Sequence, residues 1–442
     1  MKKNGSLVIS QILSHSPILK EMEYVRKLYF AYLKQLLSYV NWRKNKYTVA
    51  QLSYYQEVLC EGKCDVKWKR GDIIIKKYWN LIPFDIAILC GLNPKLKNKT
   101  KIKRIIEKIC SDLMLTKYQA IYLKRAFNHV SREEINWEDL LKDSQSKGIK
   151  KYINLVKKNI DFMSTESLDI LITATMSAGK STLINALVGK NISLMQNMAC
   201  TSKIHTIISK PFDDGITSEF DYELLLNATQ DDLLDDNEEN KSSNITVGTY
   251  FNSNLGGKRI VLHDSPGVNS SENDEHTLIS EQMIKSRNYD LVLYVLNATQ
   301  LGTNDELKHL NMVKNIIGRT KIIFVLNKVD QLISDDDNIS LVIENQRRFL
   351  ISNGFKNPTI CPVSSRAVYL YKKSKLQSLS RIEQRELYKY MDCFAENKLD
   401  EYYCNQFNMV IKQFRDEGLL LCSNSGFSYL EQIIENIYEG GC

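Results

Sequence analysis

A short polar loop with a lysine and two hydroxyl residues is the first segment of this 442-residue chain that could do chemistry. Residues 174–182 read ATMSAGKST and follow an apolar run at 168–173. Such a loop can curl backbone N–H groups around phosphates, while a helix N-terminus and a lysine compensate their charge. We predict that Lys180 reaches the β and γ phosphates of a nucleotide and that the Ser181 hydroxyl binds Mg²⁺. Ala174 departs from the usual pattern, which has a glycine there.

The predicted nucleotide contacts of this loop are five consecutive residues. They are Ala178, Gly179, Lys180, Ser181 and Thr182.

A second motif, HDSPG at 263–267, follows another apolar run. We predict that Asp264 holds Mg²⁺ through water and that the Gly267 N–H contacts the γ phosphate. One aspartate is enough for this role because protein-bound Mg²⁺ keeps several of its waters and uses few carboxylates.

Two further motifs could recognise a base. The sequence NKVD at 327–330 ends an apolar run, and the Asp330 carboxylate could accept both the ring N–H and the amino group of guanine, a pair of donors that adenine lacks. Asn327 would fix the loop and the base edge, and the Lys328 stem would pack along the ring. After the next run stand Ser364, Ser365 and Arg366, where a backbone N–H could donate to the guanine carbonyl.

The order and placement of these motifs favour a nucleotide-binding α/β domain. Short apolar runs separated mostly by helical stretches predict a largely parallel sheet covered by helices on both faces. The runs lie at 168–173, 259–263, 290–296, 321–327 and, more weakly, 359–363. Any one motif could be a turn, a strand end or a helix cap. Four of them in order, each at the carboxyl end of a predicted strand, together predict a site for GTP with Mg²⁺.

The region before the first predicted strand differs in periodicity and charge. Apolar residues recur at three- and four-residue spacing over 21–40, 102–113 and 149–163, which predicts helices. Residues 1–160 hold 32 Lys and Arg against 14 Asp and Glu, a net charge of +18, whereas the remainder holds 27 against 38. We predict a basic helical region at 1–160 and a nucleotide-binding domain at 161–442, with an exposed acidic loop at 213–243.

The basic region suggests either an acidic partner or attraction to the acidic remainder of the chain. The partner could be an anionic membrane or a protein, and a nucleic acid is less favoured. No stretch of about 18 apolar residues indicates a membrane span. The ten cysteines are irregularly spaced, which is typical of reduced thiols. We expect a cytoplasmic protein, with peripheral attachment to a membrane left open.

Three segments resemble bacterial dynamin-like large GTPases. They are MSAGKSTLINAL at 176–187, LNATQ at 296–300 and FVLNKVD at 324–330. The resemblance covers about residues 165–440 and implies a P-loop GTPase fold and Mg²⁺-dependent hydrolysis of GTP by water.

The resemblance also implies roles for particular residues. Ser177 matches the loop serine that helps to place a charge-compensating monovalent cation and the attacking water. Thr201 resembles the switch threonine that binds Mg²⁺, with Thr206 as the competing candidate. Val268 stands where small GTPases carry a glutamine, so the family implies catalysis by a homodimer of GTPase domains. The alternatives are a GTP-gated binding or signalling module with little hydrolysis, and a scaffold that has lost nucleotide binding, against which Lys180, Ser181 and Asp330 argue.

Overall fold

The computed structural model of the chain divides into two compact units. The first comprises residues 1–166 with 211–228, and the second residues 167–210 with 229–442. The structure describes residues 7–40, 42–92, 99–131, 136–193, 204–233, 244–266, 274–318, 320–334, 339–410 and 414–440. Among the helices within these ranges, none is both long and apolar enough to cross a lipid bilayer.

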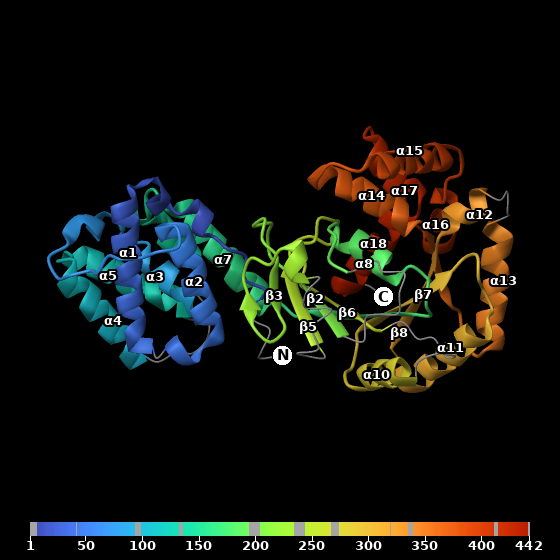
Figure 1. Ribbon diagram of the computed structural model, residues 1–442, viewed down its shortest axis with the longest axis horizontal. Coiled ribbons are helices and arrows are strands. Elements are labelled where there is room, and N and C mark those ends of the chain that lie inside the picture. Colours follow the sequence, from blue (N-terminus) through green and yellow to red (C-terminus); the bar gives the residue numbers. More distant parts are fainter. Residues whose placement is uncertain are drawn as a thin grey trace. The chain divides into compact units, whose positions relative to one another are not determined.

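The first unit is a helical bundle, shown mostly in blue to teal in Figure 1. Its helices are α1 (Glu23–Leu37), α2 (Lys46–Cys60), α3 (Ile82–Leu89), α4 (Lys99–Asp112), α5 (Lys117–Ser131), α6 (Trp137–Lys142) and α7 (Lys150–Ser164). All eight residues of α3 are buried, whereas the longer helices expose one polar face. The helices predicted at 21–40, 102–113 and 149–163 are therefore present, because their apolar stripes face one shared core.

A buried carboxylate connects four of these helices. Asp85 of α3 accepts hydrogen bonds from the hydroxyl groups of Tyr29 (α1) at 2.5 Å, Tyr55 (α2) at 3.0 Å and Tyr152 (α7). All four side chains are fully buried. Burial raises the pKa of Asp85 to about 6, although the three donors oppose that shift.

The first unit boundary lies after residue 166, close to the expected 160, and part of the segment expected as an acidic loop at 213–243 forms strands. Residues 211–228 belong to the first unit and carry the antiparallel strands β3 (Ser218–Phe220) and β4 (Leu224–Leu225). Apolar side chains of this segment, including buried Leu226, join the core of the bundle. Asp214 accepts a hydrogen bond from the Gln11 N–H at 2.6 Å, so an acidic residue of the expected loop has a structural partner. Residues 234–243 lie outside the described ranges.

The second unit contains the predicted sheet. Its described strands lie in the order β5-β2-β6-β1-β7-β8-β9, and only the β2–β6 pair is antiparallel. The strands are β1 (Leu168–Ala174), β2 (Ile204–Ser209), β5 (Asn244–Thr249), β6 (Ile260–Asp264), β7 (Leu291–Asn297), β8 (Lys321–Asn327) and β9 (Thr359–Val363). Every residue of β7 is buried, as expected for a strand covered on both faces. The mixed, mostly parallel sheet confirms the predicted α/β class.

Helices flank this sheet. They are α8 (Lys180–Val188), α10 (Asp274–Lys285), α11 (Asn304–Ile317), α12 (Val329–Ser334), α13 (Ile339–Ser352), α14 (Ser365–Leu376), α15 (Arg381–Glu396), α16 (Asp400–Phe407), α17 (Glu417–Asn424) and α18 (Phe427–Tyr438). In Figure 1, α8 and α18 lie on one side of the strands, and α10 and α11 lie on the other.

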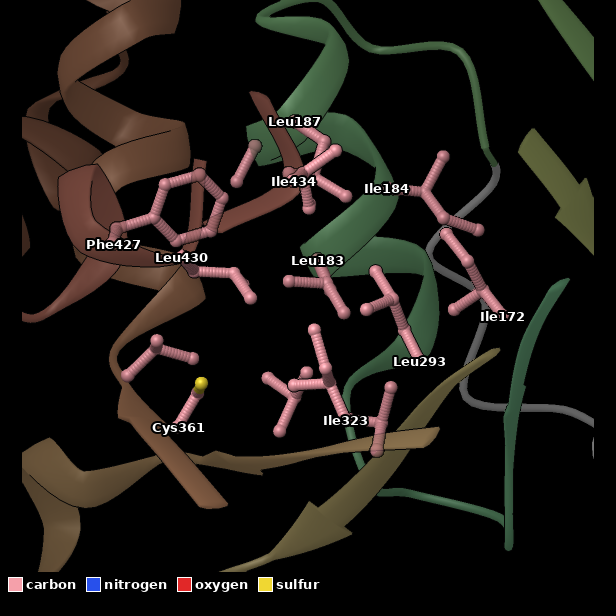
Figure 2. Packing of buried hydrophobic residues seen from close by; sticks show 14 of the residues in the cluster. Ile172, Leu183, Ile184, Leu187, Leu293, Ile323, Cys361, Phe427, Leu430 and Ile434 are labelled. Carbon is pink, nitrogen blue, oxygen red and sulfur yellow. The ribbon is translucent and has the colours of Figure 1, made fainter. Parts of the chain in front are cut away.

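The helix α8 packs between the sheet and α18. Figure 2 shows its apolar residues Leu183 and Leu187 facing Leu430 and Ile434 of α18. All four side chains are fully buried. The C-terminal helix of the described chain thus supports the helix that follows the predicted phosphate loop.

Candidate functional site

The predicted phosphate loop turns sharply between β1 and α8. Ser177 and Gly179 both have positive backbone φ angles, 61° and 87°. A Cβ atom added at Gly179 would lie 2.4 Å from the Nδ2 atom of Asn327. Glycine is therefore required at 179 for two reasons, the left-handed conformation and the close approach of another loop. Ser177 is exposed at the turn, and Ala178 beside it is buried.

Lys180 and Asp264 meet at the carboxyl edge of the sheet. Lys180 is the first residue of α8, and Asp264 is the last residue of β6, which pairs in parallel with β1. Their side chains form an ion pair, and the Ser193 hydroxyl donates to the other Asp264 oxygen at 3.2 Å. Both charged side chains are mostly buried. The predicted phosphate-binding lysine and the predicted magnesium aspartate are therefore brought together.

Asn327 connects the phosphate loop with the segment before α14. Its Nδ2 atom donates to the carbonyl oxygen of Ala178 at 3.0 Å, and its Oδ1 atom accepts from the Ser365 N–H at 3.1 Å. Asn327 is buried, so each bond satisfies a polar group that water cannot reach. The predicted role of Asn327 in fixing the loop agrees with these contacts. Because Ser365 donates its N–H to Asn327, that N–H is not the one that would meet a guanine carbonyl.

Asp330 lies beside Asn327 and is held by Ser364. The Ser364 hydroxyl donates to Asp330 Oδ1 at 2.5 Å, and both side chains are buried. Burial raises the pKa of Asp330, and the bond from Ser364 opposes that shift. Lys328, between the two motif residues, has a positive φ of 67°. The structure thus brings together three predicted base-recognition residues, Asn327, Asp330 and Ser364.

Arg366 has a partner that no motif predicted. Its Nε and one terminal nitrogen donate to the Glu386 carboxylate at 3.0 and 2.8 Å, and these bonds raise the pKa of Arg366. The Tyr390 hydroxyl also donates to Glu386, at 3.0 Å. Glu386 and Tyr390 both lie on α15, and the Asp330 charge helps to raise the pKa of Tyr390, after the larger effect of burial. This helix therefore lies next to the predicted base site.

A buried hydrogen-bond chain lies under the loop. The Ser265 hydroxyl donates to Thr173 Oγ1 at 3.0 Å, and Thr173 Oγ1 lies 3.2 Å from His309 Nε2. The other ring nitrogen of His309 lies 2.9 Å from the Tyr294 hydroxyl. Burial lowers the pKa of His309 to about 4, so the ring is neutral at pH 7. We assign these hydrogen-bonded side chains to support of the strands, because all of them are buried.

The remaining predicted residues lie in α8, in β2 or outside the described ranges. Ser181 and Thr182 lie in the first turn of α8, half-buried. Thr201 and Gly267 lie outside the described residues, so their roles stay predictions. Thr206 lies within β2, buried, with its hydroxyl 3.4 Å from His263 Nδ1, a position that disfavours it as the switch threonine.

Comparison with known proteins gives a family match to the nucleotide-site region. The family model described as the dynamin family matches residues 170–329. The bacterial dynamin-like protein of Nostoc punctiforme is 24% identical over 276 residues, which cover 57% of this chain and 38% of that protein. Dynamin-like protein A of Bacillus subtilis is 28% identical over 152 residues, 34% of this chain and 12% of that protein. The chain thus spans well under half the length of these curated relatives.

Solved GTPase domains are matched at low overall similarity. A crystal structure of Aquifex aeolicus Era bound to GDP and aluminium fluoride has a TM-score of 0.29 and 17% identity, covering 46% of this chain and 52% of that one. The G domain of the T. maritima FeoB iron transporter has a TM-score of 0.26 and 14% identity, covering 45% of this chain and 89% of that one.

Proposed function

We propose, from the match of residues 170–329 to the dynamin family model, that this chain binds GTP with Mg²⁺ and hydrolyses the bond between the β and γ phosphates. The observation that carries the proposal is the double contact of Asn327, which ties the phosphate loop to the base-recognition segment at one edge of the sheet. Ligands of open α/β sheets bind at that edge.

Guanine selection would rest on Asp330. Its Oδ1 atom is held by the Ser364 hydroxyl, which orients the carboxylate for two guanine N–H donors. An adenine ring offers no matching pair of donors, and a buried carboxylate left without partners is costly. The proposed specificity is therefore for GTP over ATP.

The metal ligands would be oxygen atoms, as Mg²⁺ prefers. Asp264 and the Ser181 hydroxyl fit this requirement, and Thr201 is proposed as a third contributor. When bound, Mg²⁺ would neutralise charge on the β and γ phosphates. Lys180 and Asp264 form an ion pair. On nucleotide binding this ion pair would break. Lys180 would then contact a phosphate, and Asp264 would contact water bound to the metal.

Hydrolysis would depend mainly on positioning and charge compensation. Ser177, exposed at the loop turn, is proposed to help place the attacking water and a monovalent cation. The N–H of Gly267 is proposed to contact the γ phosphate. Since Val268 offers no side-chain group to orient water, we propose that two GTPase domains pair across the nucleotide and exclude solvent from it.

Nucleotide binding and turnover by the full chain test the central proposal. We expect GTP to bind more tightly than ATP and to be hydrolysed only with Mg²⁺. Lys180→Ala should lose most GTP affinity while keeping its fold, and Lys321→Ala, which alters an exposed lysine at the far end of β8, is the matched control. GTP binding without turnover at any concentration would favour the GTP-gated module. Unchanged affinity in a folded Lys180→Ala protein would refute the site.

Pairing is tested by the dependence of turnover on protein concentration. We expect specific activity to rise over a roughly hundredfold range, because pairing is bimolecular. A GTP transition-state mimic should promote dimers in analytical ultracentrifugation. Constant specific activity in a chain that stays monomeric with the mimic would refute the dimer and leave GTP binding intact.

The basic region 1–160 is proposed to bind an anionic membrane surface or an acidic protein. The motivation is its net charge of +18. Near anionic lipid each Lys or Arg contributes about 1 kcal/mol, and salt screens that attraction. Co-sedimentation of the full chain with anionic liposomes should therefore weaken as salt rises. Equal sedimentation with neutral liposomes would exclude charge as the cause.

A further inference from the structure

A large open groove lies in the first unit, away from the nucleotide site. Its volume is about 700 Å³, and its walls are one face of α2 and the segment 222–227, which contains β4. All lining residues belong to the first unit. The two walls come from parts of the chain more than 150 residues apart, and buried Leu226 anchors the second wall in the core of the bundle.

Both walls carry exposed apolar side chains. Val49 of α2 is 40% exposed, and Tyr222 and Leu225 opposite it are 64% and 37% exposed. Val58 and Leu224 add half-buried apolar surface. Large apolar side chains that gather at one exposed place mark binding sites more often than isolated ones do. This clustering on both walls indicates a ligand with an apolar body.

One end of the groove is positively charged. Arg43, Lys44 and Lys46 line it, next to the N-terminus of the 15-residue helix α2. Lys46 spans the two walls, because its Nζ atom donates to the Tyr222 carbonyl at 3.3 Å and lies 5.3 Å from the centre of the Tyr222 ring. A helix N-terminus favours an anion and adds to the attraction of three cations. Glu57 and Glu223 also line the groove, so its charge is mixed rather than uniformly basic.

We propose that this groove binds a free, single-chain amphiphile with an anionic head group. The head would lie near Arg43 and Lys46, and the alkyl chain would follow the line from Val49 to Val58. The volume falls in the range of small-ligand pockets, about 300 to 1,000 Å³, which favours a small molecule over a folded partner. The α2 wall from Lys46 to Val58 is about 18 Å long at 1.5 Å per residue, enough for an extended alkyl chain.

Isothermal titration calorimetry of the full chain without nucleotide tests the proposal. Dodecyl phosphate, kept below the concentration at which it forms micelles, should bind saturably with one site. Dodecyl maltoside has the same chain and a neutral head, and it should bind at least about tenfold more weakly, the cost of a lost charge-assisted hydrogen bond. Equal binding of the two detergents would overturn the anionic part of the proposal.

Variants locate the site. Lys46→Glu should weaken dodecyl phosphate binding by about tenfold or more, and Val49→Asp should abolish it by placing a charge against the alkyl chain. Lys124→Glu makes the same charge change at an exposed position of α5 outside the groove and should leave binding unchanged. Circular dichroism checks that each variant is folded. An equal loss in Lys124→Glu, or no loss in Lys46→Glu and Val49→Asp, would overturn the assignment.

A vesicle-binding experiment distinguishes a free anionic amphiphile from anionic lipids in a bilayer. Vesicles of phosphatidylglycerol present anionic heads with buried chains. If Lys46→Glu and Val49→Asp reduce binding of monomeric dodecyl phosphate and leave vesicle binding unchanged, the free amphiphile is supported. Vesicle binding that depends on both residues, with no binding of the monomer, would overturn the proposal in favour of a membrane surface.

Discussion

Asn327 donates a hydrogen bond from its amide nitrogen to the carbonyl oxygen of Ala178 at 3.0 Å, although 149 residues separate them. The amide therefore holds the phosphate loop against the end of β8. The approach is so close that a side chain at Gly179 would displace the Asn327 amide. The segments predicted to recognise the base and to bind phosphate are thus joined through one side chain.

This arrangement predicts a severe effect of Gly179→Ala. The new methyl group would meet the Asn327 amide at 2.4 Å in a backbone with φ of 87°, so the loop must shift. Gly302→Ala is the matched control, because Gly302 has φ of 71° and no neighbour within 4 Å of an added Cβ. We expect Gly302→Ala to cost about 1 kcal/mol of stability and to bind GTP normally. Gly179→Ala should lose most GTP affinity in equilibrium binding, and equal affinities in the two variants would contradict the contact.

Asp330→Asn should change base preference. Asparagine replaces one acceptor oxygen by a donor, so guanine loses a partner and xanthine, which has a carbonyl in place of the amino group, gains one. Competition binding should show weaker GTP binding and new binding of xanthosine triphosphate. Because burial raises the pKa of Asp330, wild-type GTP affinity should also fall as pH decreases through that raised pKa, where the carboxylate is lost. Asp330→Asn should lack this pH dependence, and an Asn variant that still prefers GTP would refute the base site.

The motifs of the candidate site could be placed from the sequence because each follows a strand that its own sequence specifies. The apolar run at 321–327 matches β8, and NKVD starts at its last residue, so local pattern and site coincide. The strand β5 was not predicted, because its six residues NITVGT include polar residues and a glycine and do not form an apolar run.

The surroundings of the site were not predictable from local sequence. Glu386 reaches Arg366 from α15, twenty residues further along the chain, and belongs to no motif. The segment 211–228, which overlaps the acidic loop expected at 213–243, gives a related example. Its acidic residues are typical of an exposed loop, whereas Leu226 is buried in the helical bundle. Both outcomes depend on tertiary packing, which composition does not encode.

The buried Asp85 predicts a pH effect on the helical unit. The pKa of Asp85 is about 6 in the folded state against an ordinary value of 3.8, so the folded state binds more protons between these values. The free energy of unfolding should therefore fall as pH rises from about 4 to 6, by up to about 3 kcal/mol. The three tyrosines that face Asp85 carry no charge in this range, and Asp85→Asn should remove this contribution.

Tryptophan fluorescence can follow this unit alone, because all four tryptophans of the chain precede residue 138. The free energies of unfolding of wild type and Asp85→Asn, measured in urea, should differ by an amount that changes between pH 4.5 and 7. The exposed Asp139 provides the control substitution Asp139→Asn, for which the difference should stay constant. A constant difference for Asp85→Asn as well would show that the buried carboxyl does not titrate in this range.

Lys372 connects α14, α18 and the helix of the phosphate loop. Its Nζ atom donates to the Ala186 carbonyl in the last turn of α8 at 2.8 Å and pairs with Glu431 of α18 at 2.5 Å. The side chains are only 11% and 4% exposed. A cation at a helix C-terminus compensates the partial negative charge there, so this lysine stabilises α8 while Glu431 compensates the lysine.

Glu431→Gln should therefore destabilise the second unit by roughly 3 kcal/mol, because it leaves a buried ammonium without its carboxylate. Glu435→Gln is the matched control, because Glu435 lies on the same helix as Glu431 and pairs with Lys258. The Lys258 and Glu435 side chains are 19% and 30% exposed, so loss of this pair should cost under about 1 kcal/mol. The double variant Lys372→Met/Glu431→Leu replaces the pair by apolar side chains and should recover most of the stability, measured by heat unfolding followed with circular dichroism. It cannot restore the donor to Ala186, so GTP affinity should stay below wild type even where stability returns. Full recovery of GTP affinity in the double variant would show that Lys372 stabilises the fold without positioning the phosphate loop.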